Sequence, residues 1–242
     1  SPSCDGPMLQ SRDPLYPAAM GLAVSRVIEL VTVNTGVPTM LASVRGENVW
    51  SGIRKRPVEA DDVLWLSTLN LSGDGQADLS VHGGPDKAVY TYPSEHLGPW
   101  RDDLGEDLGP APFGENLSTA GVLEGDVCIG DVWSWGDAVL QVSQPRWPCF
   151  KLAIHRGRPE IQAAMRRTGR TGWYLRVLNP GEVPVAGPIE VVQVDPAGIS
   201  VEDAHLAMRD VHLADPSAVR AVAAHGALAD QWRTPLLDRL DR

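Results

Sequence analysis

Short runs of alternating or β-branched apolar residues recur along most of the chain, and turn-forming residues separate them. These runs predict strands over residues 24–33, 49–58, 63–66, 87–92, 127–133, 138–143, 173–178 and 189–194. Residues 94–104 suit a short helix that Gly98 and Pro99 interrupt. Many short strands between turns predict a mainly β fold with added helices, built on a closed or partly closed β-barrel.

After residue 195 the apolar residues recur at helical spacing instead. Ser200 followed by Asp203 has the form of a capping box at the start of a helix. Asp215-Pro216 predicts the start of a second helix, which Gly226 can end. A third helix is predicted over 228–240, and its larger apolar residues share one side: Trp232, Leu236, Leu237 and Leu240.

The chain therefore divides into three parts. We predict a loose N-terminal arm over 1–22, a β-barrel domain over 23–196 and a three-helix domain over 197–242. A unit of about 45 residues is short for independent stability, so the three helices are expected to pack on the barrel.

Composition narrows the classes of function. The formal net charge of −10 disfavours a nucleic-acid binder that works through a general positive field. No apolar run is long enough to predict a membrane-spanning helix. The three cysteines contain no C-x-x-C pair, which indicates neither a disulfide framework nor a four-thiolate zinc site. The first twenty residues lack the pattern of a secretory signal, so a cytoplasmic location is expected.

Positive charge is concentrated at two places in this acidic chain. Residues 151–176 hold seven Lys or Arg residues against one acidic residue, and Arg54-Lys55-Arg56 forms a second basic cluster. Two such clusters suit a small anionic ligand. On charge alone, however, the solvated faces of a helix and a turn are the commoner explanation.

Cys149 is the sharpest single candidate for chemistry. It follows a predicted strand and Pro148, so the chain leaves the sheet there and can present the thiol at a barrel mouth. Arg146 and Lys151 are positive neighbours that favour the thiolate. A thiolate binds soft metals and also acts as a nucleophile. A lone cysteine is otherwise most often buried and inert, which is our interpretation of Cys128.

Two further residues stand in unusual motifs. His82 precedes Gly83-Gly84, and glycines there allow close approach to a ligand, so the histidine is a candidate phosphate donor or proton source. A turn histidine exposed to water is an equal alternative. Asn116 carries an amide suited to the edge of a heterocycle, although an asparagine that stabilises its own turn is the commoner case.

Five uncommon motifs in fixed order change this balance, because together they resemble MOSC domains, which are named for the C-terminal part of molybdenum-cofactor sulfurases. The resemblance covers about residues 24–242. Within the family, the chain is most similar to a stand-alone bacterial type that ends in a three-helix domain. The motifs are Ser51-Gly-Ile-Arg-Lys-Arg-Pro-Val58, Asp74-Gly-Gln-Ala-Asp78, His82-Gly-Gly-Pro-Asp-Lys-Ala-Val-Tyr90, Phe113-Gly-Glu-Asn-Leu117 and Gln144-Pro-Arg-Trp-Pro-Cys-Phe-Lys151.

The resemblance implies a MOSC-type β-barrel that binds the molybdenum cofactor, a pyranopterin dithiolate with a phosphate. By the family pattern, Cys149 is the protein thiolate on molybdenum. Relatives can end in an iron–sulfur domain, for which this chain has no cysteines, so electrons are expected from a separate reductase. Residues implied for the phosphate or pterin are Arg54, Lys55 and Arg146, and those implied for the pocket wall are His82, Gly83, Gly84 and Asn116.

The implied activity is reduction of N-hydroxylated compounds, such as hydroxylaminopurines or amidoximes, to amines. Cys149 and His82 are then the catalytic candidates, with His82 as a proton donor. The expected partners are this small-molecule substrate and the reductase, with no nucleic acid and no membrane. One alternative is a module that binds or carries the cofactor without turnover. A third hypothesis is a hydrolase that uses Cys149 as nucleophile with His82 and no metal.

Overall fold

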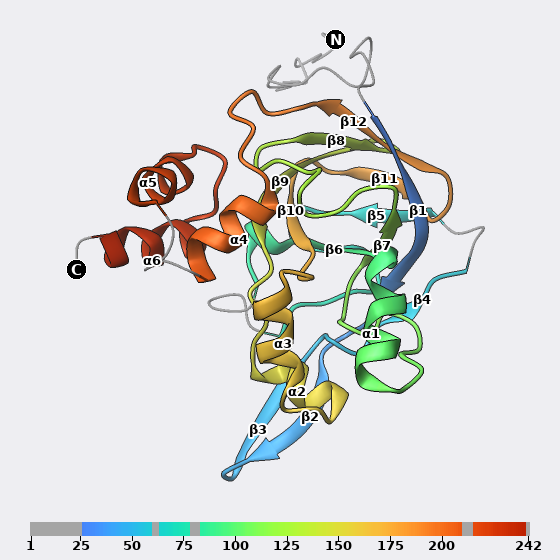
Figure 1. The fold of residues 1–242 in the computed structure, drawn as a ribbon. Coiled ribbons are helices and arrows are strands. Elements are labelled where there is room, and N and C mark those ends of the chain that lie inside the picture. Colours follow the sequence, from blue (N-terminus) through green and yellow to red (C-terminus); the bar gives the residue numbers. More distant parts are fainter. Residues whose placement is uncertain (1–25, 60–62, 78–82, 210–214, 241–242) are drawn as a thin grey trace, which may run out of the picture.

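The computed structural model describes residues 26–59, 63–77, 83–209 and 215–240. The predicted arm over 1–22 lies outside these residues. Seven strands close into a barrel (Figure 1), because the last strand of the row hydrogen-bonds back to the first. The predicted β-barrel is therefore confirmed. Around the ring the strands are β1 (Arg26–Thr35), β7 (Leu117–Ala120), β6 (Val89–Pro93), β10 (Trp173–Asn179), β9 (Ala138–Pro145), β8 (Val132–Trp135) and β12 (Pro188–Gln193).

The described residues contain five further strands outside this ring. β4 (Arg56–Pro57) pairs with one end of β1, and β5 (Val63–Leu66) pairs with β11 (Gly181–Pro184). β2 (Thr39–Val44) and β3 (Glu47–Ser51) form a hairpin that projects away from the barrel (Figure 1). The base of this hairpin leads directly into the site described below.

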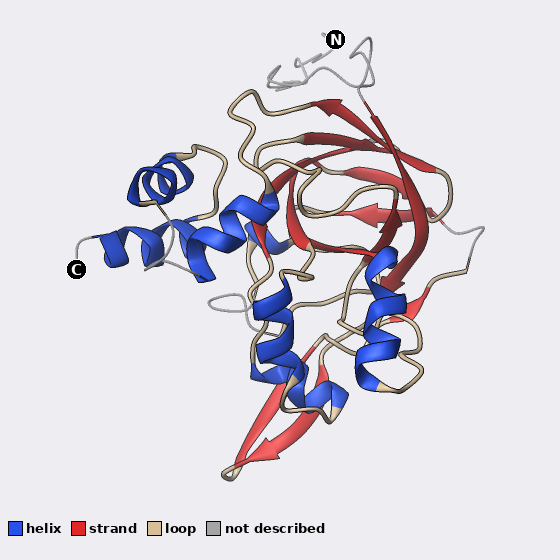
Figure 2. Cartoon of the chain, viewed as in Figure 1, coloured by secondary structure: helices blue, strands red, loops and turns tan. Residues whose placement is uncertain are grey.

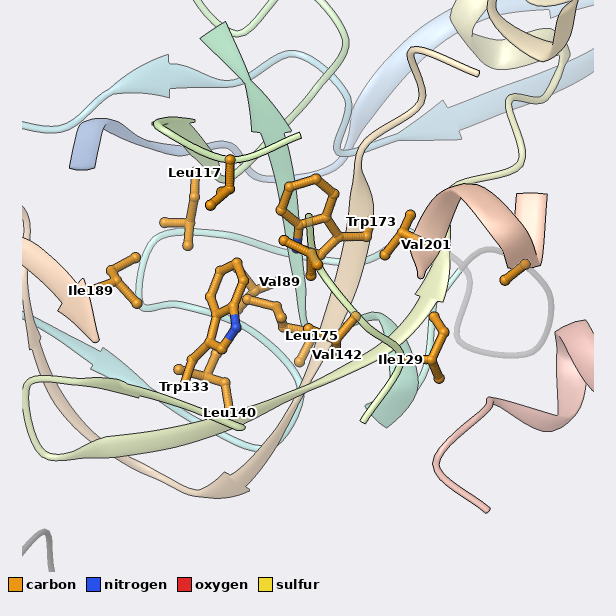
Figure 3. Packing of buried hydrophobic residues seen from close by; sticks show 14 of the residues in the cluster. Val89, Leu117, Ile129, Trp133, Leu140, Val142, Trp173, Leu175, Ile189 and Val201 are labelled. Carbon is orange, nitrogen blue, oxygen red and sulfur yellow. The ribbon is translucent and has the colours of Figure 1, made fainter. Parts of the chain in front are cut away.

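A continuous apolar core fills the barrel. Trp133 and Trp173 are fully buried and meet edge to face, with ring centroids 6.0 Å apart and an interplanar angle of 85° (Figure 3). Large aromatic rings bury much apolar surface, so this pair fills the barrel interior between β8 and β10, the two strands that flank β9. The same core reaches Val201, Trp232 and Leu236 of the C-terminal segment. The C-terminal helices therefore share one core with the barrel, as expected.

Helices cover one side and one end of the barrel (Figure 2). Two 3₁₀ turns, η1 (Pro85–Lys87) and η2 (Ser94–His96), flank β6. The longer helices are α1 (Leu97–Leu104), α2 (Phe150–Arg156), α3 (Ile161–Thr168), α4 (Val201–Arg209), α5 (Pro216–Ala224) and α6 (Asp230–Leu240).

The capping signals of the C-terminal helices are confirmed. The Ser200 hydroxyl accepts from the Asp203 N–H at 2.9 Å, and the Asp203 carboxylate accepts from the Ser200 N–H at 3.0 Å. Asp215 accepts from the Ser217 N–H at 3.0 Å and so caps α5. The sequence predicts that Leu237 shares the apolar side of the third helix, but its side chain is 45% exposed. The turn of the helix carries it away from Trp232 and Leu236.

Several local predictions were wrong for identifiable reasons. The strand predicted over 49–58 divides into β3 and β4, because the chain turns between them with a Lys55 N–H to Ile53 carbonyl hydrogen bond of 3.1 Å. The strand predicted over 127–133 begins only at Val132, since Cys128 to Asp131 form a turn with an Asp131 N–H to Cys128 carbonyl hydrogen bond of 3.1 Å. Gly98 and Pro99 do not interrupt α1; they lie in its first turn, where proline removes no helical hydrogen bond.

Other elements had no clear signal in the sequence. β2, β7 and β11 were not predicted as strands, and α2 and α3 were not predicted as separate helices. Cys128 is only partly buried, so the expectation of a buried thiol was wrong. Its place at the turn before β8, rather than inside the strand, explains this exposure.

Candidate functional site

A pocket opens where the base of the β2–β3 hairpin, the turn before β6 and the end of β9 meet. Its volume is about 120 Å³. Most of the lining residues belong to the sequence motifs. The fold brings together residues as far apart in the sequence as Ser51 and Tyr174. They are Ser51, Gly52, Ile53, Lys55, Asp74, Gly75, Gln76, Ala77, Lys87, Ala88, Tyr90, Phe113, Gly114, Asn116, Arg146, Cys149, Lys151 and Tyr174.

Cys149 lies in this pocket as a partly exposed free thiol. Strand β9 ends at Pro145, and Pro148 precedes the cysteine, so the chain turns out of the sheet at this point. Cys149 itself has an extended backbone and forms the N-cap of α2, where its carbonyl accepts from the Leu152 N–H at 3.0 Å. This placement at the end of a barrel strand agrees with the position expected from the sequence.

Among the described residues, four cationic side chains line the pocket against one carboxylate: Lys55, Lys87, Arg146 and Lys151 against Asp74. Arg146 is only 6% exposed. Its guanidinium donates to the Phe113 carbonyl at 2.6 Å and lies 4.5 Å from the ring centre of Tyr90. Lys87 lies 5.9 Å from the ring centre of Tyr174. Two of these four cations therefore lie over aromatic rings. The pocket combines positive charge with flat aromatic surface, which suits a flat anionic ligand.

Asp74 organises one wall of the pocket. Its Oδ1 accepts from the Lys55 ammonium and from the Gly36 N–H, the latter at 2.9 Å, and its Oδ2 accepts from the Asn116 amide at 2.9 Å. Burial lowers the pKa of Lys55, and the Asp74 carboxylate opposes this shift. The ion pair therefore keeps a buried lysine in place beside the pocket.

Both polar atoms of the Asn116 side chain form hydrogen bonds within the protein. Its Oδ1 accepts from the Tyr90 N–H at 3.0 Å, and its Nδ2 donates to the Asn34 carbonyl at 3.2 Å as well as to Asp74. The residue lines the pocket as predicted, but its bonds tie β1, β6 and the Asp74 loop together. Its geometry is that of a residue that shapes the pocket.

Gly83 and Gly84, the glycines that follow His82, are not among the residues that line the pocket. Gly83 and Gly84 are buried, and Gly84 has a φ of 98°, a conformation that favours glycine. The Gly84 N–H donates to the Gln76 Oε1 at 2.7 Å, and Gln76 lines the pocket. Gly84 thus reaches the site through Gln76. His82 lies outside the described residues, so its predicted role as proton donor stays a prediction.

Arg54 is not one of the described residues that line the pocket. Its guanidinium is exposed and donates to the carbonyls of Met40 and Leu41 at 3.3 and 3.5 Å, which places it against the hairpin. Lys55 and Arg146 do line the pocket, together with Cys149. The predicted basic cluster at 54–56 therefore divides, because successive side chains of this extended segment point to opposite sides.

Sequence reasoning gave no role to several residues that the pocket contains. Asp74, Gln76, Lys87 and Tyr90 lie in motifs that were recognised as unusual, so their motifs were the available signal. Tyr174 stands in an ordinary alternating strand, and no sequence signal singled it out.

Glu115 lies next to this wall and is completely buried. Burial raises the pKa of its carboxyl to about 6, while the Phe113 N–H at 3.0 Å and the nearby Arg146 oppose the shift. Its carboxylate also helps to hold the Phe113-Gly114 turn whose residues line the pocket.

Comparison with known proteins identifies the family. A sequence profile of the MOSC domain matches residues 78–191. The chain is 42% identical over 214 residues to the uncharacterized protein YflK of Bacillus subtilis strain 168, covering 88% of this chain and 95% of that protein. It is 40% identical over 185 residues to the protein YiiM of Escherichia coli strain K12, covering 75% and 82%. The chain belongs to the MOSC-domain family.

The structural neighbours agree with this MOSC assignment and with the YiiM type in particular. The crystal structure of YiiM from Geobacillus stearothermophilus superposes with a TM-score of 0.72 at 31% identity, covering 88% of this chain and 99% of that one. YiiM from Escherichia coli gives a TM-score of 0.66 at 31% identity. A protein of Gibberella moniliformis named a reductase is 36% identical over 183 residues, which are 69% of this chain but only 32% of that protein. The expected membership of the MOSC family is confirmed.

No helix in the described part of this MOSC chain is long and apolar enough to cross a membrane. Within the same residues, no group of three or more His, Cys, Asp or Glu side chains could hold a metal ion.

Proposed function

We propose that this MOSC protein is a molybdenum-cofactor-dependent reductase of N-hydroxylated compounds, which it converts to amines. The observation that carries the proposal is the placement of Cys149 in one pocket with Lys55, Lys87, Arg146 and Lys151. One soft sulfur ligand beside several cations suits a metal that an anionic organic group holds in place. Relatives named YiiM and a relative named a reductase support the same class of function.

The pocket residues fit this cofactor by their chemistry. The described residues offer no complete metal site, so a dithiolate that brings its own two sulfur ligands complements the single thiol of Cys149. Arg146, Lys87 and Lys151 would supply positive charge to bind the phosphate and the pterin. Tyr90 and Tyr174 would supply flat aromatic walls. When bound, the cofactor supplies the two-electron chemistry of the reaction.

The protein then has three tasks. Cys149 holds the metal at the pocket, and the cations and aromatic walls orient the cofactor and the substrate beside it. Reduction of an N–OH group to N–H consumes two electrons and two protons and releases water, so the site must also deliver protons. We propose His82 as the proton donor, because its imidazole titrates near neutral pH.

The proposed reaction also needs a source of electrons. The described residues contain no cluster of metal-binding side chains that could hold an iron–sulfur centre. We therefore propose a separate reductase as the partner. A reducing compartment such as the cytoplasm suits the proposal, since Cys149 must remain a free thiol.

The test uses full-length protein made in a host that synthesises the molybdenum cofactor. We expect molybdenum and pterin in near-stoichiometric amounts, and conversion of a hydroxylaminopurine to the aminopurine with reduced methyl viologen as donor. Cys149→Ser is the negative control. Protein that holds the cofactor but gives no turnover with hydroxylaminopurines or amidoximes would overturn the reductase and favour a carrier. Turnover of an ester or amide by metal-free protein would instead favour the hydrolase.

A further inference from the structure

The loop that carries Cys149 is held by helices outside the barrel. Trp147 stands two residues before the cysteine, and its ring is the centre of this contact. The Arg166 guanidinium of α3 lies 4.8 Å from the ring centre, the His205 ring of α4 lies 5.6 Å away and the Trp232 ring of α6 lies 5.8 Å away. Three helices from distant parts of the chain thus converge on one side chain of the Cys149 loop.

Pro148, the residue immediately before Cys149, is held by the same helix. Its carbonyl accepts from the Arg166 Nη2 at 2.8 Å and from the Gln162 Nε2 at 3.1 Å. A carbonyl that accepts from both a guanidinium and an amide has little freedom to rotate, since one bond is charge-assisted. Arg166 contacts both residues that precede the thiol, through a stacking contact and a hydrogen bond.

The C-terminal helices in turn hold Arg166. Nε2 of His205 lies 2.8 Å from the Arg166 carbonyl, and the His205 side chain is almost fully buried. The Trp232 indole donates to the Ala204 carbonyl at 3.2 Å, which ties α6 to α4 next to His205. A continuous set of contacts therefore runs from α6 and α4 through α3 to Pro148.

We infer that α3 and the C-terminal helices position the Cys149 thiol, and that Arg166 is the positioning residue at their point of contact. The inference rests on the proposed function only in taking Cys149 as the working thiol. The contacts do not serve the apolar core alone: two of them are polar bonds to a single backbone carbonyl beside the cysteine. Such a bond fixes the direction in which the next residue leaves the loop.

A thiol-reactivity experiment tests this inference without any cofactor. Cys4 and Cys128 are first replaced by serine, so that Cys149 is the single thiol of the full-length protein. The rate of alkylation by iodoacetamide is then followed by intact-protein mass spectrometry at constant pH. Arg166→Met removes the guanidinium, whereas Arg166→Lys keeps its charge but loses the planar fork. Arg167→Met is the matched control, because Arg167 is the exposed neighbour on the same helix.

We expect alkylation about fivefold to tenfold faster in both Arg166 variants, because the freed loop opens locally. The melting temperature should stay within a few degrees of the parent, and Arg167→Met should react at the parent rate. Unchanged alkylation in both Arg166 variants would overturn the inference. The inference would also be overturned if Arg166→Met altered the alkylation rate but Arg166→Lys did not. The charge of residue 166 would then explain the effect without its geometry.

The cofactor-loaded enzyme gives a second readout. With Arg166→Lys, kcat should fall about tenfold while KM stays unchanged, because the substrate walls are intact and only the thiol is displaced. A rise in KM with normal kcat would contradict a positioning role. If alkylation changes as expected but the loaded parent protein turns over no N-hydroxylated substrate, the proposed function fails and the positioning of Cys149 stands.

Discussion

Asp74 and Lys55 form a buried ion pair in the wall of the pocket. Their side chains are 4% and 7% exposed, and the second oxygen of Asp74 binds the Asn116 amide. Each partner compensates a charge that would be costly to bury alone. The pair therefore fixes the position of Lys55, whose ammonium stands at the edge of the ligand space.

The first prediction concerns this ion pair. Asp74→Asn leaves the Lys55 ammonium buried without its counter-charge and should lower the free energy of unfolding by about 3–5 kcal/mol. Urea denaturation measures the change. Asp86→Asn is the matched control, because Asp86 pairs with Arg176 at a more exposed site and should cost about 1 kcal/mol or less. Equal losses in the two variants would contradict the role assigned to Asp74.

The second prediction separates the two described cysteines. Cys149→Ser replaces a soft sulfur with a harder hydroxyl, so bound molybdenum and N-reductive activity should fall to near background while stability changes little. The variant should still bind some pterin, because Lys87, Arg146 and Lys151 remain in its pocket. Metal analysis and turnover measure these effects. A loaded Cys149→Ser protein with full activity would remove that residue from the mechanism.

Cys128→Ser is the control for the same experiment. The thiol lies away from the pocket and is only partly buried, so the substitution should cost about 1 kcal/mol or less and leave activity unchanged. A stronger effect on activity than that of Cys149→Ser would reverse the assignment of the two thiols.

The barrel and its C-terminal helices could be predicted because their signals are local. Alternating apolar residues placed β5, β6, β9, β10 and β12 to within a few residues, and Ser200, Asp203 and Asp215 marked helix starts that the hydrogen bonds confirm. β7 was missed because only four residues of it pair, in a segment rich in polar side chains. Its buried Ser118 and Thr119 depend on neighbours that are distant in the sequence.

The site was predictable only as a set of motifs. The motifs led to Cys149, Lys55, Asn116 and Arg146, all of which line one pocket. They did not show that Arg54 lies against the hairpin, because its contacts with the Met40 and Leu41 carbonyls depend on how β2 folds back. Nor did they show the contact of Trp147 with α3, α4 and α6, since it depends on how three later helices pack.

The third prediction concerns the C-terminal helices. Trp232 is 2% exposed, belongs to the barrel core and contacts Trp147. Trp232→Ala should lower the free energy of unfolding by about 3–5 kcal/mol, because removal of a large buried aromatic side chain creates a cavity in the core. Leu237→Ala is the control, since Leu237 is 45% exposed on the same helix and should cost about 0.5 kcal/mol or less. Chemical denaturation measures both, and similar values for the two would contradict a shared core.

The last prediction uses the pH dependence of stability. Burial raises the pKa of Glu115 from its ordinary value of 4.5 to about 6. The folded state therefore holds the proton more tightly than the unfolded state, and the stability that Glu115 contributes is present below pH 4.5 and lost as the pH rises to about 6. Glu115→Gln does not titrate and keeps an oxygen that accepts from the Phe113 N–H.

The free energy of unfolding of Glu115→Gln, relative to the parent, should consequently rise by about 2 kcal/mol between pH 4 and pH 7.5. Urea denaturation at several pH values measures this difference. His155, a residue of α2 whose pKa burial lowers to about 4, also titrates in this range, but its effect cancels because both proteins contain it. Glu106→Gln is the opposite control. The Arg156 guanidinium bound to Glu106 lowers the pKa of that carboxyl, so the parent gains relative to this variant as the pH rises from acid values toward 4.5. A pH-independent difference for Glu115→Gln would show that its carboxyl ionises as freely in the folded protein as in the unfolded chain.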